Sequence, residues 1–248
     1  MSSGFAITVT NLNFRYSGQN VDCLSTINLT VNKGDRFGLF GPNGAGKTTL
    51  ISIMTGLLKP SNGNAKLFGI DVSIDREAKK IFGYVPQDFA FYEELTPMEN
   101  LEFFGALSRV SSAQIKKRAD ELFDVLGLAE VRNKPAKQFS GGMKRRLNIA
   151  IGVIHEPPII FLDEPTVGVD VQTRSAIIDY LKQLNANGAT LIYTSHLLQE
   201  AQDLCNRIAL IDAGKIILDD DLAKLLVAHN EKGLEELFLS LTGKAFRD

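Results

Sequence analysis

Hydrophobic and polar residues alternate along the first forty positions of the chain, which is the pattern of half-buried β-strands. The alternation is regular in Ile7–Val9, in Leu12–Phe14 and in Ile27–Val31. A turn signal at Asn32–Asp35 follows, and after it comes the continuous apolar run Phe37–Phe40. Such a run is typical of a strand that is buried on both faces. The chain is therefore predicted to begin with short strands and then to enter a buried sheet.

The middle third of the sequence carries signals of helix starts instead. Thr96 and Glu99 have the spacing of a capping box, and Ser111 and Gln114 offer a second one. Residues from about 88 to 155 are therefore predicted to form a helical subdomain that is inserted between strand-rich segments.

Strand and helix patterns alternate again after this insertion. Ile159–Leu162 and Ala189–Tyr193 are typical of buried strands, Val171–Leu184 is typical of a helix, and residues 208–218 are typical of a hairpin. This order predicts a parallel sheet covered by helices. The expected fold class is α/β, with a mostly parallel sheet core, an N-terminal antiparallel β subdomain and the inserted helical subdomain.

Composition narrows the class of protein without identifying it. The 248 residues are 44% hydrophobic and 23% charged, and the net charge of −2 gives no support to nucleic-acid binding. The longest purely apolar run, Ile149–Ile154, is far shorter than the roughly 20 residues that span a bilayer. The first ten residues do not look like a signal peptide, and Cys23 and Cys205 are too isolated to suggest a disulfide or a zinc site. We expect a cytoplasmic chain that reaches a membrane only through a partner.

A glycine-rich loop joins the buried run to a predicted helix. It matches the pattern G-x-x-x-x-G-K-T/S in the strand–loop–helix context that its mechanism requires. In this pattern backbone N–H groups surround the phosphates of a nucleotide, Lys47 reaches the β- and γ-phosphates, and Thr48 binds Mg²⁺. The predicted phosphate-binding residues are Gly41, Pro42, Asn43, Gly44, Ala45, Gly46, Lys47 and Thr48.

Two carboxylates end the buried strand that begins at residue 159. Asp163 and Glu164 would be costly to bury there unless they met a cation, and P-loop NTPases hold Mg²⁺ with an Asp at this place. Glu164 is predicted to orient or deprotonate an attacking water. Asn32–Asp35 has the letters of the guanine-reading N-K-x-D pattern, but it precedes the phosphate loop and is rejected as a GTPase motif. The absence of G-x-G-x-x-G argues against a Rossmann dinucleotide site.

A second anion-binding helix start lies well beyond the phosphate loop. Ser140, Gly141 and Gly142 directly precede a stretch with helical spacing of apolar residues. The first N–H groups of a helix have no intrahelical partner and attract anions. The sequence therefore raises the question of which phosphate this second helix start would bind.

Together these motifs resemble the nucleotide-binding domain of ATP-binding cassette (ABC) proteins, over nearly the whole chain. The resemblance rests on Gly41–Thr49, Gln87, Ser140–Gly142, Asp163–Glu164, Val169–Asp170 and His196, in this order and spacing. Phe139–Leu147, Pro165–Asp170 and Leu234–Gly243 are especially similar to the ATPase subunits of ABC-2-type exporters. That subgroup is associated with the export of drugs, lipids and polysaccharides.

The resemblance implies roles that the motifs alone do not assign. Tyr16 would stack on adenine, and Thr49 would join the nucleotide-binding loop. Gln87 would contact Mg²⁺ or its water, and His196 would contact the γ-phosphate. Asp170 would lie at a dimer interface and could equally cap the following helix.

The same resemblance implies that the second helix start serves another subunit. Ser140–Gly142 would face the γ-phosphate held by Lys47 of a second chain, which is either an identical copy or a paralogue. Phe139 and Met143 depart from the commoner family string Leu-Ser-Gly-Gly-Gln, and Met143 cannot complete a capping box. The expected cofactors are ATP and Mg²⁺.

A separate integral-membrane permease is the other partner that the resemblance implies, and it would hold the chain at the inner face of the cell membrane. Residues 1–220 would form the ATPase domain, and residues 221–248 a short C-terminal helical extension. Four apolar residues in a loop-like segment, Phe89, Phe91, Tyr92 and Leu95, either form the docking groove for the permease or seal the core of the helical subdomain. The alternative function is a non-transport ABC ATPase that acts on nucleic acid or ribosomes.

Overall fold

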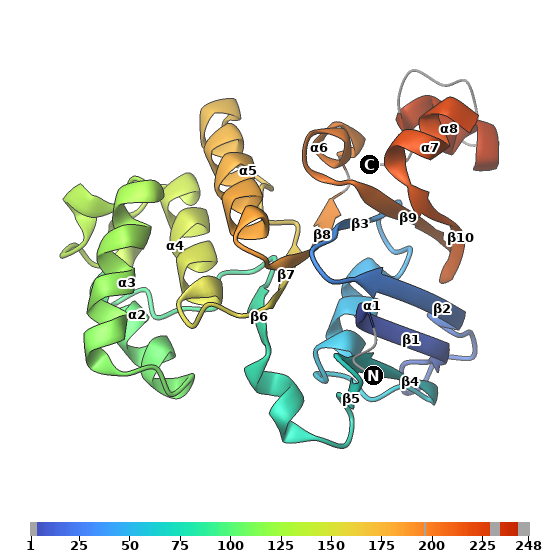
Figure 1. Cartoon of the computed structure of the whole chain (residues 1–248), viewed down its shortest axis with the longest axis horizontal. Helices are drawn as coiled ribbons and strands as arrows, with labels where there is room; N and C mark the ends of the chain where they lie inside the picture. Colours follow the sequence, from blue (N-terminus) through green and yellow to red (C-terminus); the bar gives the residue numbers. More distant parts are fainter. Residues whose placement is uncertain (1–3, 196, 229–233, 243–248) are drawn as a thin grey trace.

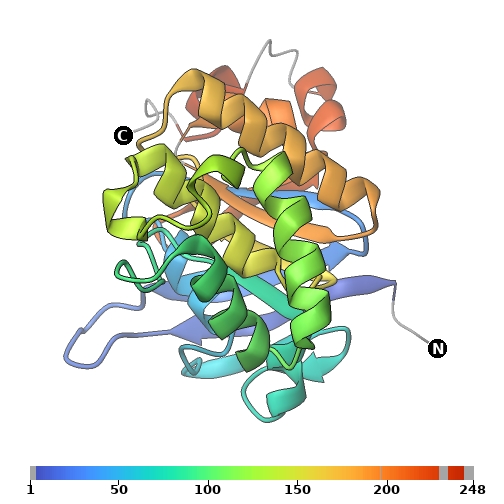
Figure 2. The ribbon, with the colours of Figure 1, turned by 90° about the vertical axis from the view of Figure 1, so that its left-hand side faces the viewer.

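The computed structural model describes residues 4–195, 197–228 and 234–242 of the chain. It contains a small antiparallel sheet, a larger mixed sheet and a group of helices that lies to one side of the sheets, next to β6 (Figure 1). In the view of Figure 2, the helices between residues 97 and 153 lie in front of the sheets. No helix among the described residues is long and apolar enough to cross a membrane.

The antiparallel sheet is formed by the N-terminal third of the chain. Its strands are β1 (Phe5–Phe14), β2 (Leu24–Asn32), β4 (Asn62–Leu67) and β5 (Ile70–Asp71), in the order β2-β1-β4-β5. The two short alternating stretches predicted near the N-terminus are parts of one strand, β1, whose pairing with β2 is irregular around Asn11. Asn11 has a φ of 46°, and this bulge explains why the hydrophobic alternation breaks within β1.

The larger sheet contains the three predicted buried strands, the predicted hairpin and one further strand. They are β3 (Arg36–Phe40), β6 (Phe82–Val85), β7 (Ile159–Asp163), β8 (Thr190–Ser195), β9 (Arg207–Asp212) and β10 (Lys215–Asp221), in the order β10-β9-β3-β8-β7-β6. All neighbouring strands are parallel except β9 and β10, which form the predicted hairpin. The prediction of an α/β fold with a mostly parallel sheet and an antiparallel N-terminal sheet is confirmed.

Both faces of the larger sheet are covered, which is why its central strands β3, β7 and β8 are buried almost throughout. In β7, Ile159 and Phe161 pack with the β subdomain and with α1 (Lys47–Met54), while Ile160 and Leu162 pack with the helices of the other face. These helices include α5 (Val171–Ala186) and α6 (Leu198–Leu204). Each face has its own hydrophobic core, and packing on both faces fixes the positions of the strand ends.

The helical group consists of α2 (Pro97–Leu107), α3 (Ser112–Val125) and α4 (Gly141–Val153), with short 3₁₀ turns at residues 129–131 and 136–138. Both predicted capping boxes are present, at Thr96 with Glu99 and at Ser111 with Gln114. Asn100, which is fully buried, ties the loop before α2 to the helix by donating hydrogen bonds to the carbonyls of Tyr92 and Thr96.

The C-terminal segment forms α7 (Leu222–Ala228) and α8 (Leu234–Thr242). Leu234, Leu237 and Phe238 are buried in the core on the α5 and α6 side of the sheet. The apolar residues at helical spacing in the tail therefore pack α8 onto this face of the larger sheet.

Candidate functional site

The predicted motifs meet at one edge of the larger sheet. Because β3, β6, β7 and β8 are parallel, their carboxyl ends lie on the same side. Phe40 pairs with Ser195, and Asp163 pairs with Thr194, so the ends of these strands are level with each other. In open α/β sheets ligands bind at this edge. The loops after β3, β6, β7 and β8 therefore surround one site.

The phosphate loop, residues Gly41–Thr48, connects β3 to α1. Gly46 caps α1 in a left-handed conformation with a φ of 108°, and no side chain caps the helix start. A Cβ atom at Gly41 would come within 2.1 Å of the Ile211 carbonyl oxygen, so this position accepts only glycine without rearrangement. The backbone N–H groups of the first turn are thus left to an anionic ligand.

Lys47 lies inside this loop with 5% of its surface exposed. Its Nζ donates hydrogen bonds to the carbonyl oxygens of Gly41, at 2.7 Å, and of Pro42, at 3.2 Å. Burial lowers the pKa of Lys47, and the nearby carboxylates of Glu164 and Asp163 oppose that shift. The ammonium group is therefore positioned where the phosphates of a nucleotide would accept its hydrogen bonds.

Asp163 faces the phosphate loop from the end of β7. Its Oδ1 accepts hydrogen bonds from Thr48 Oγ1, at 3.3 Å, and from Thr194 Oγ1, at 2.7 Å. Its Oδ2 is buried and has no hydrogen-bond partner among the described residues. Burial is the largest influence on the pKa of this carboxyl group and raises it.

A buried carboxylate oxygen without a donor is costly unless a cation approaches it. Thr48 and Asp163 are hard oxygen ligands of the kind that Mg²⁺ selects, and Mg²⁺ commonly takes its other ligands from phosphates and water. Among the described residues no cluster of three or more His, Cys, Asp or Glu side chains offers an all-protein metal site. The residues present therefore fit a magnesium ion that binds together with a nucleotide.

Glu164 follows Asp163 and turns toward the loop after β6. Its φ of 48° is left-handed, a conformation that costs a non-glycine residue about 1 kcal/mol or more and is concentrated at functional sites. Its backbone N–H donates to Thr194 Oγ1, at 3.0 Å, and its Oε2 accepts a hydrogen bond from Gln87 Nε2, at 3.3 Å. The structure thus brings Gln87 and Glu164 together beside Lys47, while His196 lies outside the described residues.

Tyr16 reaches the same site from the β subdomain. Its hydroxyl shares a hydrogen bond of 2.9 Å with Thr49 Oγ1 in the first turn of α1. The ring packs edge-on against Phe14, with 4.8 Å between the ring centroids, and the residue is 40% exposed. An anchored ring with an exposed surface beside the phosphate loop is suited to stacking on a base.

The second helix start, Ser140–Gly142, is the N-terminus of α4, and we call it the signature turn. Ser140 Oγ accepts a hydrogen bond of 3.3 Å from the N–H of Met143, and Met143 offers no oxygen for the reciprocal bond. Ser140 and Gly141 are exposed. Figure 1 shows α4 and α1 on opposite sides of β6 and β7. The structure does not bring this turn to its own chain's phosphate loop.

Asp170 caps α5, as the sequence allows. Its carboxylate accepts hydrogen bonds from the N–H and the hydroxyl of Thr173, at 2.9 and 2.8 Å. These bonds, above all the one from the Thr173 N–H, lower the pKa of Asp170. A Cβ atom at Gly142 would lie 3.4 Å from the Thr173 side chain, so the signature turn lies against the start of α5.

Sequence patterns did not identify Glu200 and Thr194. Glu200 is 2% exposed, and it accepts hydrogen bonds from Thr166, Tyr193 and Ser195. It thereby joins the loop after β7 to the end of β8. Tyr193 and Ser195 lie only seven and five residues before Glu200, but Thr166 is 34 residues away, and no motif relates Glu200 to these three residues.

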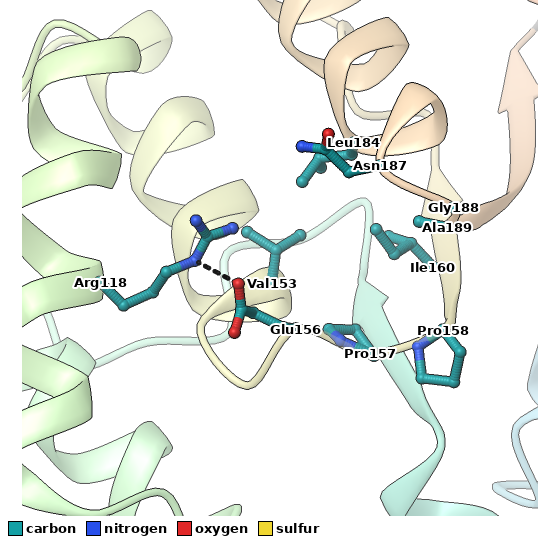
Figure 3. A pocket seen from close by; sticks show the side chains of 10 residues that line it. All are labelled: Arg118, Val153, Glu156, Pro157, Pro158, Ile160, Leu184, Asn187, Gly188 and Ala189. Atoms are coloured by element: carbon teal, nitrogen blue, oxygen red, sulfur yellow. Dashed lines mark ion pairs between the residues drawn. The ribbon is translucent and has the colours of Figure 1, made fainter.

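A pocket of about 270 Å³ lies at the opposite edge of the sheet (Figure 3). Pro157 and Pro158 precede β7, and Gly188 and Ala189 precede β8, so the pocket opens at the amino ends of these strands. Arg118 of α3 reaches across it to Glu156, with 3.6 Å between Nε and Oε1. It is therefore distinct from the nucleotide site.

The fold and the site define a P-loop nucleotide-binding protein, because a phosphate loop faces a buried Asp across one edge of a parallel sheet. A family model described as "ABC transporter" matches residues 24–167. The chain belongs to the ABC transporter family and forms its ATP-binding domain.

Relatives and a solved structure agree with this assignment. The chain is 45% identical over 77% of its length to the linearmycin resistance ATP-binding protein LnrL of Bacillus subtilis. It is 40% identical over 86% of its length to the daunorubicin resistance ATP-binding protein DrrA3 of Streptomyces coeruleorubidus. The chain spans 62% and 67% of these relatives' own lengths.

One similar solved structure is the dimeric ATP-binding cassette MJ0796 in a post-hydrolysis state with ADP and Pi. Its sequence is 29% identical, its TM-score is 0.80, and the match covers 87% of this chain and 98% of that one.

Proposed function

We propose that the chain is the ATP-binding and ATP-hydrolysing subunit of an ABC-2-type exporter, in which ATP-driven dimer closure moves a separate membrane permease. The proposal rests on two hydrogen bonds, one from Thr48 to Asp163 and one from Gln87 to Glu164, which bring these four side chains to one site. Positioning and charge neutralisation are what phosphoryl transfer to water requires. The names of LnrL and DrrA3 associate those relatives with drug resistance, which supports export over other transport.

Different residues of the site perform different parts of the reaction. The N–H groups of the phosphate loop and Lys47 hold the β- and γ-phosphates of ATP. Mg²⁺, when bound by Thr48, Asp163 and the phosphates, offsets the negative charge that hydrolysis redistributes. Glu164 orients the attacking water and accepts its proton, and Gln87 holds the Glu164 carboxylate in place. Tyr16 stacks on the adenine.

The signature turn completes the site of a second chain. Its exposed Ser140 and its first helical N–H groups bind the γ-phosphate held by the partner's phosphate loop. The dimeric form of the similar MJ0796 structure supports this arrangement. Hydrolysis removes the γ-phosphate contacts, so the two chains separate and the attached permease helices move. His196 and Asp170 would contribute to the γ-phosphate contact and to the interface.

A groove beside the Gln87 loop is suited to the permease. A cavity of about 470 Å³ lies between α2, α4 and β6, and it is lined by apolar side chains that include Leu57, Phe104 and Leu107. Leu57 and Leu107 are 61% and 71% exposed. An amphipathic helix docks its apolar face into such a groove. Through this contact the chain would sit at the inner face of the cell membrane, with residues 1–220 as the ATPase domain and 221–248 as its extension.

The central test uses Glu164→Gln with the wild-type chain. We expect the variant to bind Mg-ATP, to form a persistent dimer in size-exclusion chromatography, and to hydrolyse ATP at least about tenfold more slowly. The wild-type rate per chain should rise steeply with protein concentration, because the active site needs two chains. Wild-type turnover in Glu164→Gln would remove Glu164 from the catalytic role, and a concentration-independent rate would contradict the dimer.

A further inference from the structure

One face of α4 is bonded to the segment 86–90, which follows β6 and contains Gln87. Arg145 and Asn148 are three residues apart on this helix and therefore lie on the same side of it. Both are buried, with 5% and 2% of their surfaces exposed. Buried polar side chains are retained at such a place only when they are hydrogen-bonded, and here their partners are backbone atoms outside the helix.

Arg145 holds this segment near its centre. Its Nη1 donates a hydrogen bond of 2.6 Å to the carbonyl oxygen of Gln87. Its guanidinium group lies over the ring of Phe89, with 4.8 Å from Cζ to the ring centroid. A second donor, Nη2, reaches the carbonyl oxygen of Val167 at 3.4 Å, in the loop between Glu164 and Asp170. One side chain thus contacts the loops after β6 and after β7.

Asn148 holds the two ends of the same segment. Its Nδ2 donates to the carbonyl oxygen of Pro86 at 3.0 Å, and its Oδ1 accepts from the N–H of Ala90 at 3.4 Å. Asn148, Pro86 and Ala90 also line the apolar groove between α2, α4 and β6. An occupant of that groove would therefore press directly on the segment that α4 holds.

The Gln87 side chain points to the nucleotide site while its backbone is bound to α4. Its Nε2 donates to Glu164 Oε2, and its carbonyl oxygen accepts from Arg145. The helix that Arg145 belongs to begins at the signature turn. A continuous set of contacts therefore runs from Glu164 through Gln87 and Arg145 to Ser140.

We propose that Arg145 is a positioning residue that makes the orientation of the signature turn follow the Gln87 segment. A change at the γ-phosphate that moves Gln87 would then reorient the turn that binds the partner chain's nucleotide. This inference rests on the proposed function, because only in a dimer does the signature turn have a nucleotide to bind. The role belongs to the guanidinium group, whose rigid planar fork directs Nη1 to the Gln87 carbonyl oxygen and Nη2 to that of Val167, whereas the compact ammonium group of Lys lacks this spacing between donors.

Arg146 is a matched control on the same helix. It donates to three backbone carbonyl oxygens, those of Leu126 at 2.7 Å, of Gly127 at 3.3 Å and, within its own helix, of Gly142 at 3.4 Å. The first two carbonyls belong to the end of α3 and the third to α4, so all three lie inside the helical group. Loss of Arg146 thus removes similar hydrogen bonds and the same charge, yet it leaves the connection to Gln87 intact.

The test compares Arg145→Gln, Arg145→Lys and Arg146→Gln in the full-length chain. Affinity for ATP without Mg²⁺ is measured first, by titration of a fluorescent ATP analogue. All three variants should bind it within about twofold of wild type, because the phosphate loop is untouched. At saturating Mg-ATP, Arg145→Gln should lose at least about tenfold in kcat, since small misplacements of a positioned group cost this much. Arg146→Gln should lose less than about threefold, and Arg145→Lys should lie between the two.

Two further measurements test whether a loss in kcat comes from the Gln87 segment and from the signature turn. Hydrogen exchange of the amides in segment 86–90 should become faster in Arg145→Gln and stay unchanged in Arg146→Gln. In a Glu164→Gln background, Arg145→Gln should weaken the ATP-dependent dimer by at least about tenfold. If Arg145→Gln does not fold, Arg145→Lys is compared with Arg146→Lys in the same assays.

Equal losses in kcat for the Arg145 and Arg146 variants would overturn the inference, as would a full rate in Arg145→Gln. A wild-type chain that hydrolyses ATP and dimerises normally, together with an unaffected Arg145→Gln, refutes only the role of Arg145. Absence of ATP-dependent dimers in Glu164→Gln itself would instead refute the proposed function.

Discussion

Thr48 Oγ1 donates a hydrogen bond of 3.3 Å to Asp163 Oδ1, across 115 positions of the chain. Thr194 Oγ1 donates to the same oxygen at 2.7 Å, so Oδ1 is fully engaged. The other oxygen, Oδ2, is buried and has no hydrogen-bond partner among the described residues. Two of the predicted magnesium ligands, Thr48 and Asp163, are therefore assembled before any ion binds, and the assembly leaves one carboxylate oxygen in an unfavourable environment.

Asp163→Asn should stabilise the nucleotide-free chain and abolish its activity. The amide removes a buried charge and can still accept the hydrogen bond from Thr194, so we expect a higher thermal midpoint without ligand. Hydrolysis should fall at least about a hundredfold, because the magnesium site loses its carboxylate. Differential scanning fluorimetry and a phosphate-release assay measure both effects. A lower midpoint in the variant would show that the Oδ2 environment is satisfied in solution.

Saturating Mg-ATP gives a second comparison for the same variant. The wild-type chain should gain more in thermal midpoint from Mg-ATP than from ATP with EDTA, since ligand binding adds to stability by mass action. In Asp163→Asn the two gains should be equal. An unequal gain would place the magnesium ion on other residues.

The signature turn allows a prediction about Met143. Ser140 caps α4 through the Met143 N–H, whereas a Gln at this position could also reach back to the Ser140 N–H and complete a capping box. Met143→Gln should therefore raise the thermal midpoint slightly and change the ATPase rate by less than about tenfold, because Ser140 and the helix N–H groups remain in place. A larger change in rate at saturating Mg-ATP would show that the side chain at position 143 contacts the partner's nucleotide.

The aromatic residues before α2 have different roles, which the sequence left open. Phe91 packs against the hydrophobic core of the helical group. Tyr92 is 50% exposed and stacks near Phe103 and Phe104, with ring centroids 5.0 and 6.2 Å away. Phe104 lines the apolar groove. The structure thus supports the core interpretation for Phe91. Tyr92 does not itself line the groove, and its role in docking stays a prediction.

Replacement of Phe91 and Tyr92 separately tests this division. Tyr92→Ala should weaken co-purification with the permease and leave the thermal midpoint within about 2 °C, as expected for a surface change below 0.5 kcal/mol. Phe91→Ala should lower the midpoint by several degrees through lost packing. Equal co-purification of wild type and Tyr92→Ala would argue that the permease docks elsewhere.

The motifs predicted the site at one edge of the sheet because each motif combines particular residue types with a position directly after a strand. Gly41–Thr48 and Asp163 each follow a buried apolar strand, and parallel strands place their carboxyl ends together. Arg145 could not be found in this way. The sequence shows a basic run at Lys144–Arg146, and such runs are usually exposed to solvent. Arg145 is nevertheless buried, because it bonds to carbonyl oxygens that are distant in the sequence. Backbone acceptors leave no signature in the sequence, so such contacts appear only in the folded chain.

His155 should make stability sensitive to acid. It is half-buried at the end of the α4 segment, beside the apolar groove, and its Nε2 lies 3.1 Å from the Phe82 carbonyl oxygen. Because a carbonyl oxygen only accepts, Nε2 carries the proton and the neutral ring is already bonded. Burial lowers the pKa of His155 below its ordinary 6.5, and the bond to Phe82 opposes that shift only in part.

The direction of the change in stability with pH follows from proton binding. With a pKa lowered in the folded chain, His155 binds its proton more readily when the chain is unfolded, so its contribution to stability is lost as the pH falls below about 6.5. The wild-type thermal midpoint should therefore drop between pH 7.5 and pH 5.5. His155→Gln keeps a donor for Phe82 without titrating in this range, and its midpoint should drop less. An equal drop in the thermal midpoints of the two chains across this range would contradict a buried neutral His155. An unchanged ATPase rate of His155→Gln at pH 7.5 would confirm that the substitution leaves the nucleotide site intact.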